Sequence, residues 1–151
     1  MSTTVDTSLA SPVIRAASAA DADRVYALLE QLEPAYSPDR AAFDANFPLL
    51  LDDQSTSVLL VAEDGSGTVI GYALTTITPL LHANGSSAQL QELVVDDSHR
   101  GEGVGTAIVE EVERVCQERS VRQITVASRR SADFYERIGY RSSADFLKRT
   151  F

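Results

Sequence analysis

The residues best suited to chemistry lie in one short segment, from Val95 to Thr106. Its sequence is Val-Asp-Asp-Ser-His-Arg-Gly-Glu-Gly-Val-Gly-Thr. The three alternating glycines have no side chains, so that successive backbone N–H groups can surround an anion. An amphipathic helix follows directly, and the unpaired N–H groups of its first turn and the positive end of its dipole favour the same ligand. This segment, called the glycine loop below, therefore predicts a phosphate-binding site.

The spacing of the glycines excludes two common phosphate-binding motifs. No Gly-Lys-Ser/Thr follows the loop, so it is not a P-loop. A dinucleotide fingerprint needs Gly-x-Gly-x-x-Gly at the start of a strand–helix–strand unit, whereas these glycines alternate and lie far along the chain. A glycine-rich turn without a ligand is the other interpretation, but a plain turn does not require the backbone entropy that three alternating glycines cost.

The elements around the loop follow an order that predicts one mixed sheet. Apolar runs predict strands over residues 13–16, 57–63, 68–78, 88–95 and 121–127, and a final hairpin or strand pair over 140–151. Helical spacing predicts helices over residues 18–32, 104–116 and 131–138, and Ser37-Pro38 predicts the start of another helix that breaks or kinks near Pro48. The order β-α-α-β-β-β-α-β-α-β predicts an α/β (α+β) fold, with a mixed, mostly antiparallel sheet of six to seven strands and helices on both faces.

Composition indicates one domain. The 151 residues, 44% of them hydrophobic, suffice for one full core and are too few for two domains of ordinary size. We expect a flexible lead-in over residues 1–11 and a single domain over 12–151. The one cysteine, Cys116, excludes an internal disulfide and fits a reducing compartment. We expect a soluble, cytoplasmic protein, because no apolar run approaches the length of a membrane span and the N-terminus does not resemble a secretory signal.

The formal net charge of −9, from 22 acidic and 13 basic residues, argues against nonspecific binding of nucleic acid, which needs a basic face. The same charge favours cationic substrates by long-range attraction, although an acidic surface also simply keeps a protein soluble. Histidine, cysteine and carboxylate residues show no metal-ligand spacing, so we expect no metal.

Three segments together resemble the GNAT superfamily of N-acetyltransferases, over about residues 13–148. The first joins Leu93-Val94-Val95 to the glycine loop, in which residues 100–105 follow the pattern Arg/Gln-x-x-Gly-x-Gly. The second, residues 131–140, is similar to the family's Ala-x-x-Phe/Leu-Tyr-x-x-x-Gly-Phe/Tyr helix. The third is the hairpin with Val-Ala-Glu at 61–63 and Val-Ile-Gly-Tyr-Ala at 69–73, which looks like the family's paired central strands. The resemblance implies the GNAT fold.

The resemblance also implies acetyl-coenzyme A (acetyl-CoA) as the acyl donor. Backbone N–H groups of the glycine loop would hold its pyrophosphate, and its pantetheine arm would pair with the strand before the loop like an added strand. A serine just before the 131–138 helix matches a family position that contacts coenzyme A, and Arg129 or Arg130 could reach the 3′-phosphate. The implied donor-binding residues are Leu93, Val94, Val95, Arg100, Gly101, Glu102, Gly103, Val104, Gly105, Thr106 and Ser128.

Two residues are catalytic candidates by resemblance. Tyr135 matches the family's usual general acid, since a phenol with a pKa of about 10 can donate a proton to a departing thiolate. Without the motif it is equally typical of an aromatic residue on the apolar face of a short helix. Glu92 is the candidate base, because an alkyl ammonium with a pKa of about 10.4 must lose a proton before it attacks. A solvated glutamate, with a water relay as the base, is the alternative.

The implied reaction is transfer of an acetyl group to a primary amine by direct attack in a ternary complex. The acceptor is a small-molecule or protein amine, and the resemblance allows a homodimer. It also implies an acceptor pocket between residues 30–51 and the loop 80–87, where Tyr36, Phe43 and Phe47 are either walls or plain core. Two other interpretations stay open, a non-catalytic acyl-CoA-binding regulatory module and an unrelated nucleotide-phosphate binder.

Overall fold

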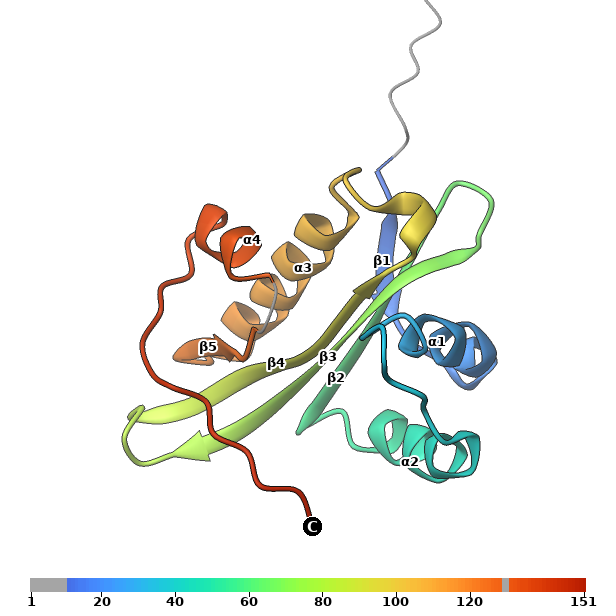
Figure 1. Ribbon diagram of the computed structural model, residues 1–151. Helices are drawn as coiled ribbons and strands as arrows, with labels where there is room; N and C mark the ends of the chain where they lie inside the picture. The colour runs from blue at the N-terminus through green and yellow to red at the C-terminus, as the bar shows by residue number, and fades with distance from the viewer. Residues whose placement is uncertain (1–10, 129–130) are drawn as a thin grey trace, which may run out of the picture.

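The computed structural model describes residues 11–128 and 131–151, and a five-stranded sheet forms its centre (Figure 1). The strands are β1 (Val13–Ala16), β2 (Ser57–Glu63), β3 (Val69–Leu80), β4 (Gly85–Val95) and β5 (Gln123–Val126), and they lie side by side in that order. Neighbours from β1 to β4 are antiparallel, whereas β5 runs parallel to β4. The predicted mixed, mostly antiparallel sheet is therefore confirmed.

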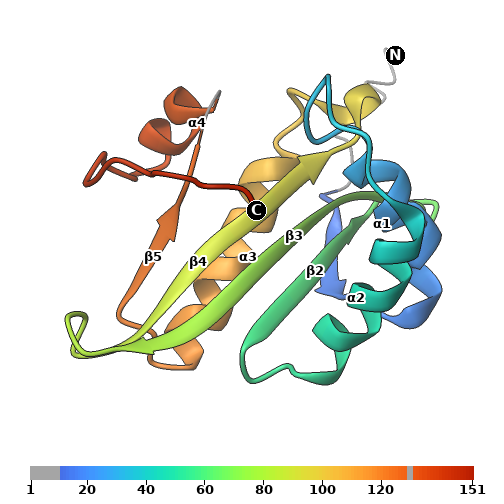
Figure 2. The ribbon, with the colours of Figure 1, turned by 60° about the horizontal axis from the view of Figure 1, so that its bottom comes forward.

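Helices cover both faces of this sheet, as the sequence predicts (Figures 1 and 2). After a short 3₁₀ turn, η1 (Ala19–Asp21), helices α1 (Ala22–Leu29) and α2 (Arg40–Asp52) lie on one face. Helix α3 (Val104–Glu118) lies on the other, and α4 (Ala132–Arg137) follows β5. The core has two corresponding parts, one packed around α3 and one between the sheet and the pair α1 and α2.

The prediction of six to seven strands is wrong, because the final strand pair does not form. Residues 140–151 contain no strand, and Phe146, Leu147 and Phe151 are exposed. Apolar residues in this segment cluster at Phe146 and Leu147 instead of alternating, so a strand here would have no apolar face to bury. Within the described residues, the order of elements ends with α4 rather than with a strand.

The β3–β4 hairpin is longer than its sequence indicates. The sequence predicts a loop over residues 80–87, but Leu80 pairs with Gly85 and the connecting turn shrinks to residues 81–84. Asn84 adopts a φ of 57°, the left-handed conformation that asparagine tolerates in tight turns.

Helix α2 also departs from its predicted start. The Asp39 side chain accepts a hydrogen bond from the Ala42 N–H at 2.9 Å, so Asp39 is the N-cap and Ser37-Pro38 precedes the helix. Pro48 neither ends nor breaks the assigned helix, which runs on to Asp52. Phe47, buried against the sheet, holds this part of the helix in place through tertiary packing.

Helix α3 lies very close to the sheet where it crosses Gly71. A Cβ atom at Gly71 would lie 3.0 Å from Ile108 Cδ1 and 3.1 Å from the Val94 carbonyl oxygen. A glycine in β3 is therefore what lets α3 pack this closely, and it fixes where the first turn of α3 meets the end of β4.

Candidate active site

A β-bulge in β4 determines which face of the sheet carries Glu92. Leu74 pairs with Glu92 and Thr75 with Leu90, so Gln91 is an extra residue in β4. Leu90 lies in the core around α3, whereas Glu92 faces the α2 side together with Leu74. In a regular strand Leu90 and Glu92 would share one face. The bulge therefore turns the carboxylate toward α1 and α2.

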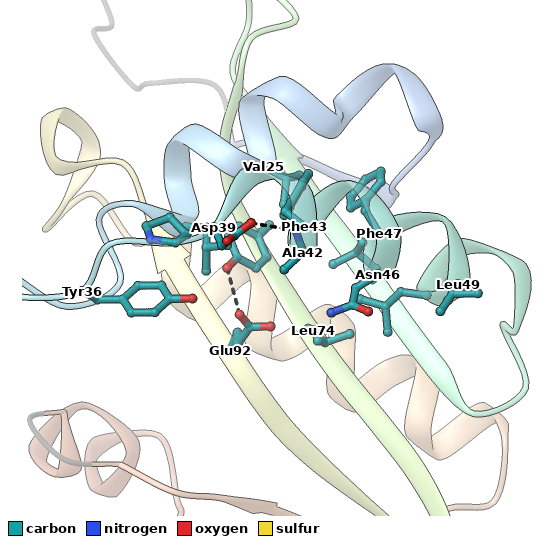
Figure 3. Close-up of a pocket in the computed structure, with 15 residues that line it drawn as sticks. Val25, Tyr36, Asp39, Ala42, Phe43, Asn46, Phe47, Leu49, Leu74 and Glu92 are labelled. Atoms are coloured by element: carbon teal, nitrogen blue, oxygen red, sulfur yellow. Dashed lines mark hydrogen bonds between the residues drawn. The ribbon is translucent and has the colours of Figure 1, made fainter. Parts of the chain in front are cut away.

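Glu92 lies at the wall of a cavity of about 500 Å³ between the sheet and the helices α1 and α2 (Figure 3). This volume is typical of small-molecule sites. Most of the lining is aliphatic or aromatic, with Phe43 and Phe47 contributed by α2. Polar groups come from Asp39, Asn46, Glu92 and the hydroxyls of Tyr36 and Tyr72, so the cavity combines a large apolar surface with a few polar groups.

The Glu92 carboxylate has one direct partner within this cavity. The Tyr72 hydroxyl donates a hydrogen bond to Glu92 Oε1 at 3.3 Å, from the neighbouring strand β3. Burial raises the pKa of Glu92 above its ordinary value, and the hydrogen bond from Tyr72 opposes part of that rise. Burial and the nearby Glu92 charge also raise the pKa of Tyr72, which keeps its hydroxyl protonated. A carboxylate with a raised pKa is a better proton acceptor near neutral pH.

The glycine loop contains two left-handed glycines just before α3 begins. Gly101 and Gly103 adopt φ values of +81° and +84°, a left-handed conformation that favours glycine. The Ala107 N–H donates to the Gly103 carbonyl oxygen and begins the α3 hydrogen-bond ladder. The N–H groups of residues 104–106 therefore have no partner within the helix. Nothing lies within 4 Å of a Cβ built on either Gly101 or Gly103, so neither position is crowded.

Hydrogen bonds from α1 and its following turn hold the start of the loop. Arg24 donates to Asp96 Oδ2 at 3.2 Å and to the Val69 carbonyl oxygen at 2.8 Å. The Asp97 N–H donates to Gln31 Oε1 at 2.9 Å. The loop is thus attached to the same helical layer that covers the cavity.

Charged side chains within the loop pair with one another. Arg100 Nη2 lies 2.8 Å from Asp97 Oδ1, and His99 Nδ1 lies 2.9 Å from Glu102 Oε2. These pairs are exposed or half-exposed and contribute little stability. They leave the backbone N–H groups as the loop's distinctive donors.

The end of β4 that leads into the loop has a free edge. Within residues 11–128 and 131–151, β5 pairs with β4 only from Ser87 to Leu90, and the two strands then diverge (Figure 2). Leu93 and Val95 pack toward the α3 side, while Val94 is buried on the α1 side. Their backbone groups on the β5 side can therefore pair with an added extended chain.

Tyr135 lies on the opposite side of the sheet from the cavity, in the core around α3. It is 7% exposed, and its ring stacks on Tyr140 with centroids 5.7 Å apart. Burial raises the pKa of Tyr135, so its hydroxyl stays protonated. The neighbouring Phe134 reaches the loop, since its Cζ would lie 3.5 Å from a Cβ at Gly105. The structure thus brings α4 to the glycine loop, but Tyr135 is not among the described residues that line the Glu92 cavity.

Ser128 stands at the entry to α4. Its Oγ accepts a hydrogen bond from the N–H of Ser131, the N-cap residue of α4, at 3.0 Å. Arg129 and Arg130, the predicted contacts for a 3′-phosphate, lie outside the described residues.

The sequence also matches a known protein family. The model for the acetyltransferase (GNAT) family matches residues 22–140, most of the chain. The protein belongs to the GNAT acetyltransferase family.

Individual relatives are more distant. A glucosamine 6-phosphate N-acetyltransferase from Trypanosoma brucei brucei is 28% identical over 79 residues, which cover 51% of this chain and 54% of the relative. The match thus spans about half the length of that curated relative. Among solved structures, a transcriptional regulator from Bacillus halodurans C-125 has a TM-score of 0.82 at 24% identity, covering 93% of this chain and 99% of that one. A glucosamine-6-phosphate N-acetyltransferase from Arabidopsis thaliana has a TM-score of 0.80 at 22% identity, covering 93% and 98%. These two structures show the fold.

The cavity of this GNAT protein was only partly predictable from the sequence. Tyr36, Phe43 and Phe47 do line the cavity, as expected. Residues 80–87, the other expected boundary of an acceptor pocket, form the tip of the β3–β4 hairpin and are not among the described residues that line this cavity. Sequence reasoning missed Tyr72, whose hydroxyl among the apolar residues 69–74 was the available clue.

The described parts of this GNAT domain hold no metal-binding cluster, since no three or more histidine, cysteine or carboxylate side chains gather there to hold a metal ion. None of the helices in those parts is long and apolar enough to cross a membrane.

Proposed function

We propose that this GNAT protein transfers an acetyl group from acetyl-CoA to a primary amine bound in the Glu92 cavity. One observation carries the proposal. Within the described residues, the end of β4 pairs with β3 but has a free edge on its β5 side, and it leads from Glu92 directly into the glycine loop. One strand end would therefore offer a backbone edge and an anion site on one side and a carboxylate on the other. The acyl donor needs the backbone edge and the anion site, and the amine acceptor needs the carboxylate.

The donor residues would act through their backbone. N–H groups from Arg100 to Thr106 would bind the pyrophosphate, and the positive end of α3 would favour its charge. The free edge of Leu93, Val94 and Val95 would pair with the amide groups of the pantetheine arm. Acetyl-CoA supplies the thioester carbonyl that the amine attacks.

Proton transfer would use two groups of this chain. Glu92 would accept a proton from the ammonium, directly or through water, so that the nitrogen lone pair can form the new C–N bond. As the C–S bond breaks, Tyr135 would donate its proton to the departing thiolate, and the second proton that the nitrogen loses on becoming an amide would return through water to the Tyr135 phenolate. The raised pKa values of both residues fit these roles, since Glu92 becomes more basic and Tyr135 stays protonated.

The test combines binding with turnover. Calorimetric titration should detect acetyl-CoA binding, and an amine panel should include acceptors that release free thiol. Tyr135→Phe should lower kcat by about tenfold or more, because general acids commonly contribute at least that much. Tyr140→Phe is the matched control, since it removes a neighbouring hydroxyl while keeping the stacked ring.

Failure of this proposal has two recognisable forms. A protein that neither binds acetyl-CoA nor releases thiol with any amine is not an acetyltransferase of this kind. Binding without turnover, together with indifference to Tyr135→Phe, would instead support a non-catalytic acyl-CoA-binding regulatory module.

A further inference from the structure

We infer that the acceptor is a small primary amine on an uncharged apolar body, aromatic or branched aliphatic, and that phosphorylated amino sugars are poor substrates. The inference rests on the proposed function, because it names the substrate class of the same cavity. It follows from how polar and apolar groups are distributed over the lining.

The body of the cavity is apolar and partly aromatic. Phe43 and Phe47 stack with their ring centroids 5.1 Å apart, and both line the cavity along α2. Leu59 and Leu74 line it from the sheet. Such walls favour a ligand with a hydrophobic body, since each buried CH₂ contributes about 0.8 kcal/mol. A polyhydroxylated sugar ring would instead need hydrogen-bond partners for every buried hydroxyl.

Two tyrosine hydroxyls accompany Glu92 where β4 lines the cavity. Figure 3 shows the Tyr36 ring directing its hydroxyl toward Glu92, on which the Tyr72 hydroxyl also acts. An ammonium group at this end would have a carboxylate acceptor, while the rest of the ligand extends along Phe43 and Phe47. The cavity thus matches a molecule with one amine head and an apolar body.

A phosphate group would find no cation here. Among the described residues that line the cavity, none is lysine, arginine or histidine, and the two ionisable acids, Asp39 and Glu92, are carboxylates. A buried anion next to carboxylates, without a positive partner, is strongly unfavourable.

The helix terminus nearest the cavity is also unavailable to an anion. Asp39 caps α2 by accepting from the Ala42 N–H at 2.9 Å, so a carboxylate already holds the favourable position at that N-terminus. Arg40, the next residue, is paired with Asp23 and Asp44 and lies over the Tyr26 ring at 4.8 Å. These contacts hold the Arg40 guanidinium outside the set of residues that line the cavity, so it does not provide a positive partner for a phosphate there.

The first experiment compares phenethylamine with glucosamine 6-phosphate, by thiol release at saturating acetyl-CoA. We expect kcat/KM to be higher for phenethylamine by about tenfold or more, because the phosphate is left unpaired. Equal or higher kcat/KM for glucosamine 6-phosphate would overturn the inference while leaving the proposed acetyltransferase function intact.

A pair of alanines on α2 provides a matched test of the cavity itself. Ala42 and Ala45 are both exposed on the helix, but only Ala42 is among the described lining residues. Leucine is a good helix former at either position. Ala42→Leu should weaken calorimetric binding of phenethylamine by about tenfold through steric loss of cavity volume, whereas Ala45→Leu should leave it unchanged.

The binding measurement tests the inferred substrate class even if neither amine is acetylated. Phenethylamine binding that Ala42→Leu weakens and Ala45→Leu does not, with no binding of glucosamine 6-phosphate, supports the inference. Absence of phenethylamine binding, or equal binding by both variants, overturns it.

Discussion

The glycine loop and the Glu92 cavity are neighbouring sites built in opposite ways. The loop is a continuous run of residues whose distinctive groups are backbone N–H donors and two left-handed glycines. The cavity is built from side chains of α1, α2, β2, β3 and β4, which are far apart in the chain. A site built from backbone groups depends little on which side chains are present. It therefore suits the part of a substrate whose structure does not vary. A side-chain site changes its preference with each substitution.

This contrast predicts that substitutions will separate the two sites. Changes in the cavity should alter turnover or amine preference and spare acetyl-CoA binding. Changes in the loop backbone should weaken acetyl-CoA binding and spare the cavity.

The largest effect is expected from Glu92→Gln, which keeps the shape of the side chain but removes the proposed base. We expect kcat to fall by about 10² to 10⁴, the usual contribution of a positioned base. The dissociation constant of acetyl-CoA, measured by calorimetry, should not change. Glu110→Gln, on the exposed face of α3, makes the same charge change as a control. A kcat within twofold of the parent protein would assign the proton to a water relay instead.

A smaller effect is expected from Gly103→Ala in the loop. Alanine at a φ of +84° is strained by about 1–2 kcal/mol, and a relaxed loop would no longer aim its N–H groups at one point. We expect acetyl-CoA affinity to fall by about tenfold, in line with that strain, with amine binding unchanged.

Gly67→Ala is a matched control for this change. Gly67, in the β2–β3 turn, has a φ of +82°, and, as at Gly103, a Cβ atom added there would meet nothing within 4 Å. Both variants should lose similar thermal stability. If Gly67→Ala weakened acetyl-CoA binding as much as Gly103→Ala did, the effect would reflect general destabilisation and not the loop geometry.

The smallest effect is expected from Tyr72→Phe, which removes the hydroxyl that donates to Glu92 Oε1. That hydrogen bond lowers the pKa of Glu92, so its loss raises the pKa further. A base works only when it is deprotonated, so the acidic limb of the kcat/KM–pH profile should move to higher pH. Below neutral pH we expect a rate loss of about a fewfold, with little change at high pH.

Tyr26→Phe serves as the control for this pH profile. The Tyr26 hydroxyl donates to the Pro38 carbonyl oxygen at 3.0 Å and does not contact Glu92. A shift of the acidic limb in the opposite direction for Tyr72→Phe would show that Glu92 is not the titrating base.

The sequence by itself determined the backbone geometry of the glycine loop and most of the helices and strands around it. The boundaries of β2, the Asp64–Gly67 turn and the start of α3 at Val104 follow from short patterns in which each residue's neighbours are close in the chain. The glycine loop is predictable for the same reason, because its geometry depends on the alternation of Gly101, Gly103 and Gly105.

Only the tertiary structure decided the Glu92 cavity. The bulge at Gln91 sets the face on which Glu92 lies, yet neither Gly nor Pro marks its place in the sequence. Whether an apolar residue such as Phe43 lines a cavity or fills the core depends on the helix and sheet packed around it. The expected strand pair over residues 140–151 failed for a related reason, since strand formation depends on a partner edge and a buried face more than on local composition. Backbone geometry is encoded locally, whereas a cavity exists only after distant elements have packed.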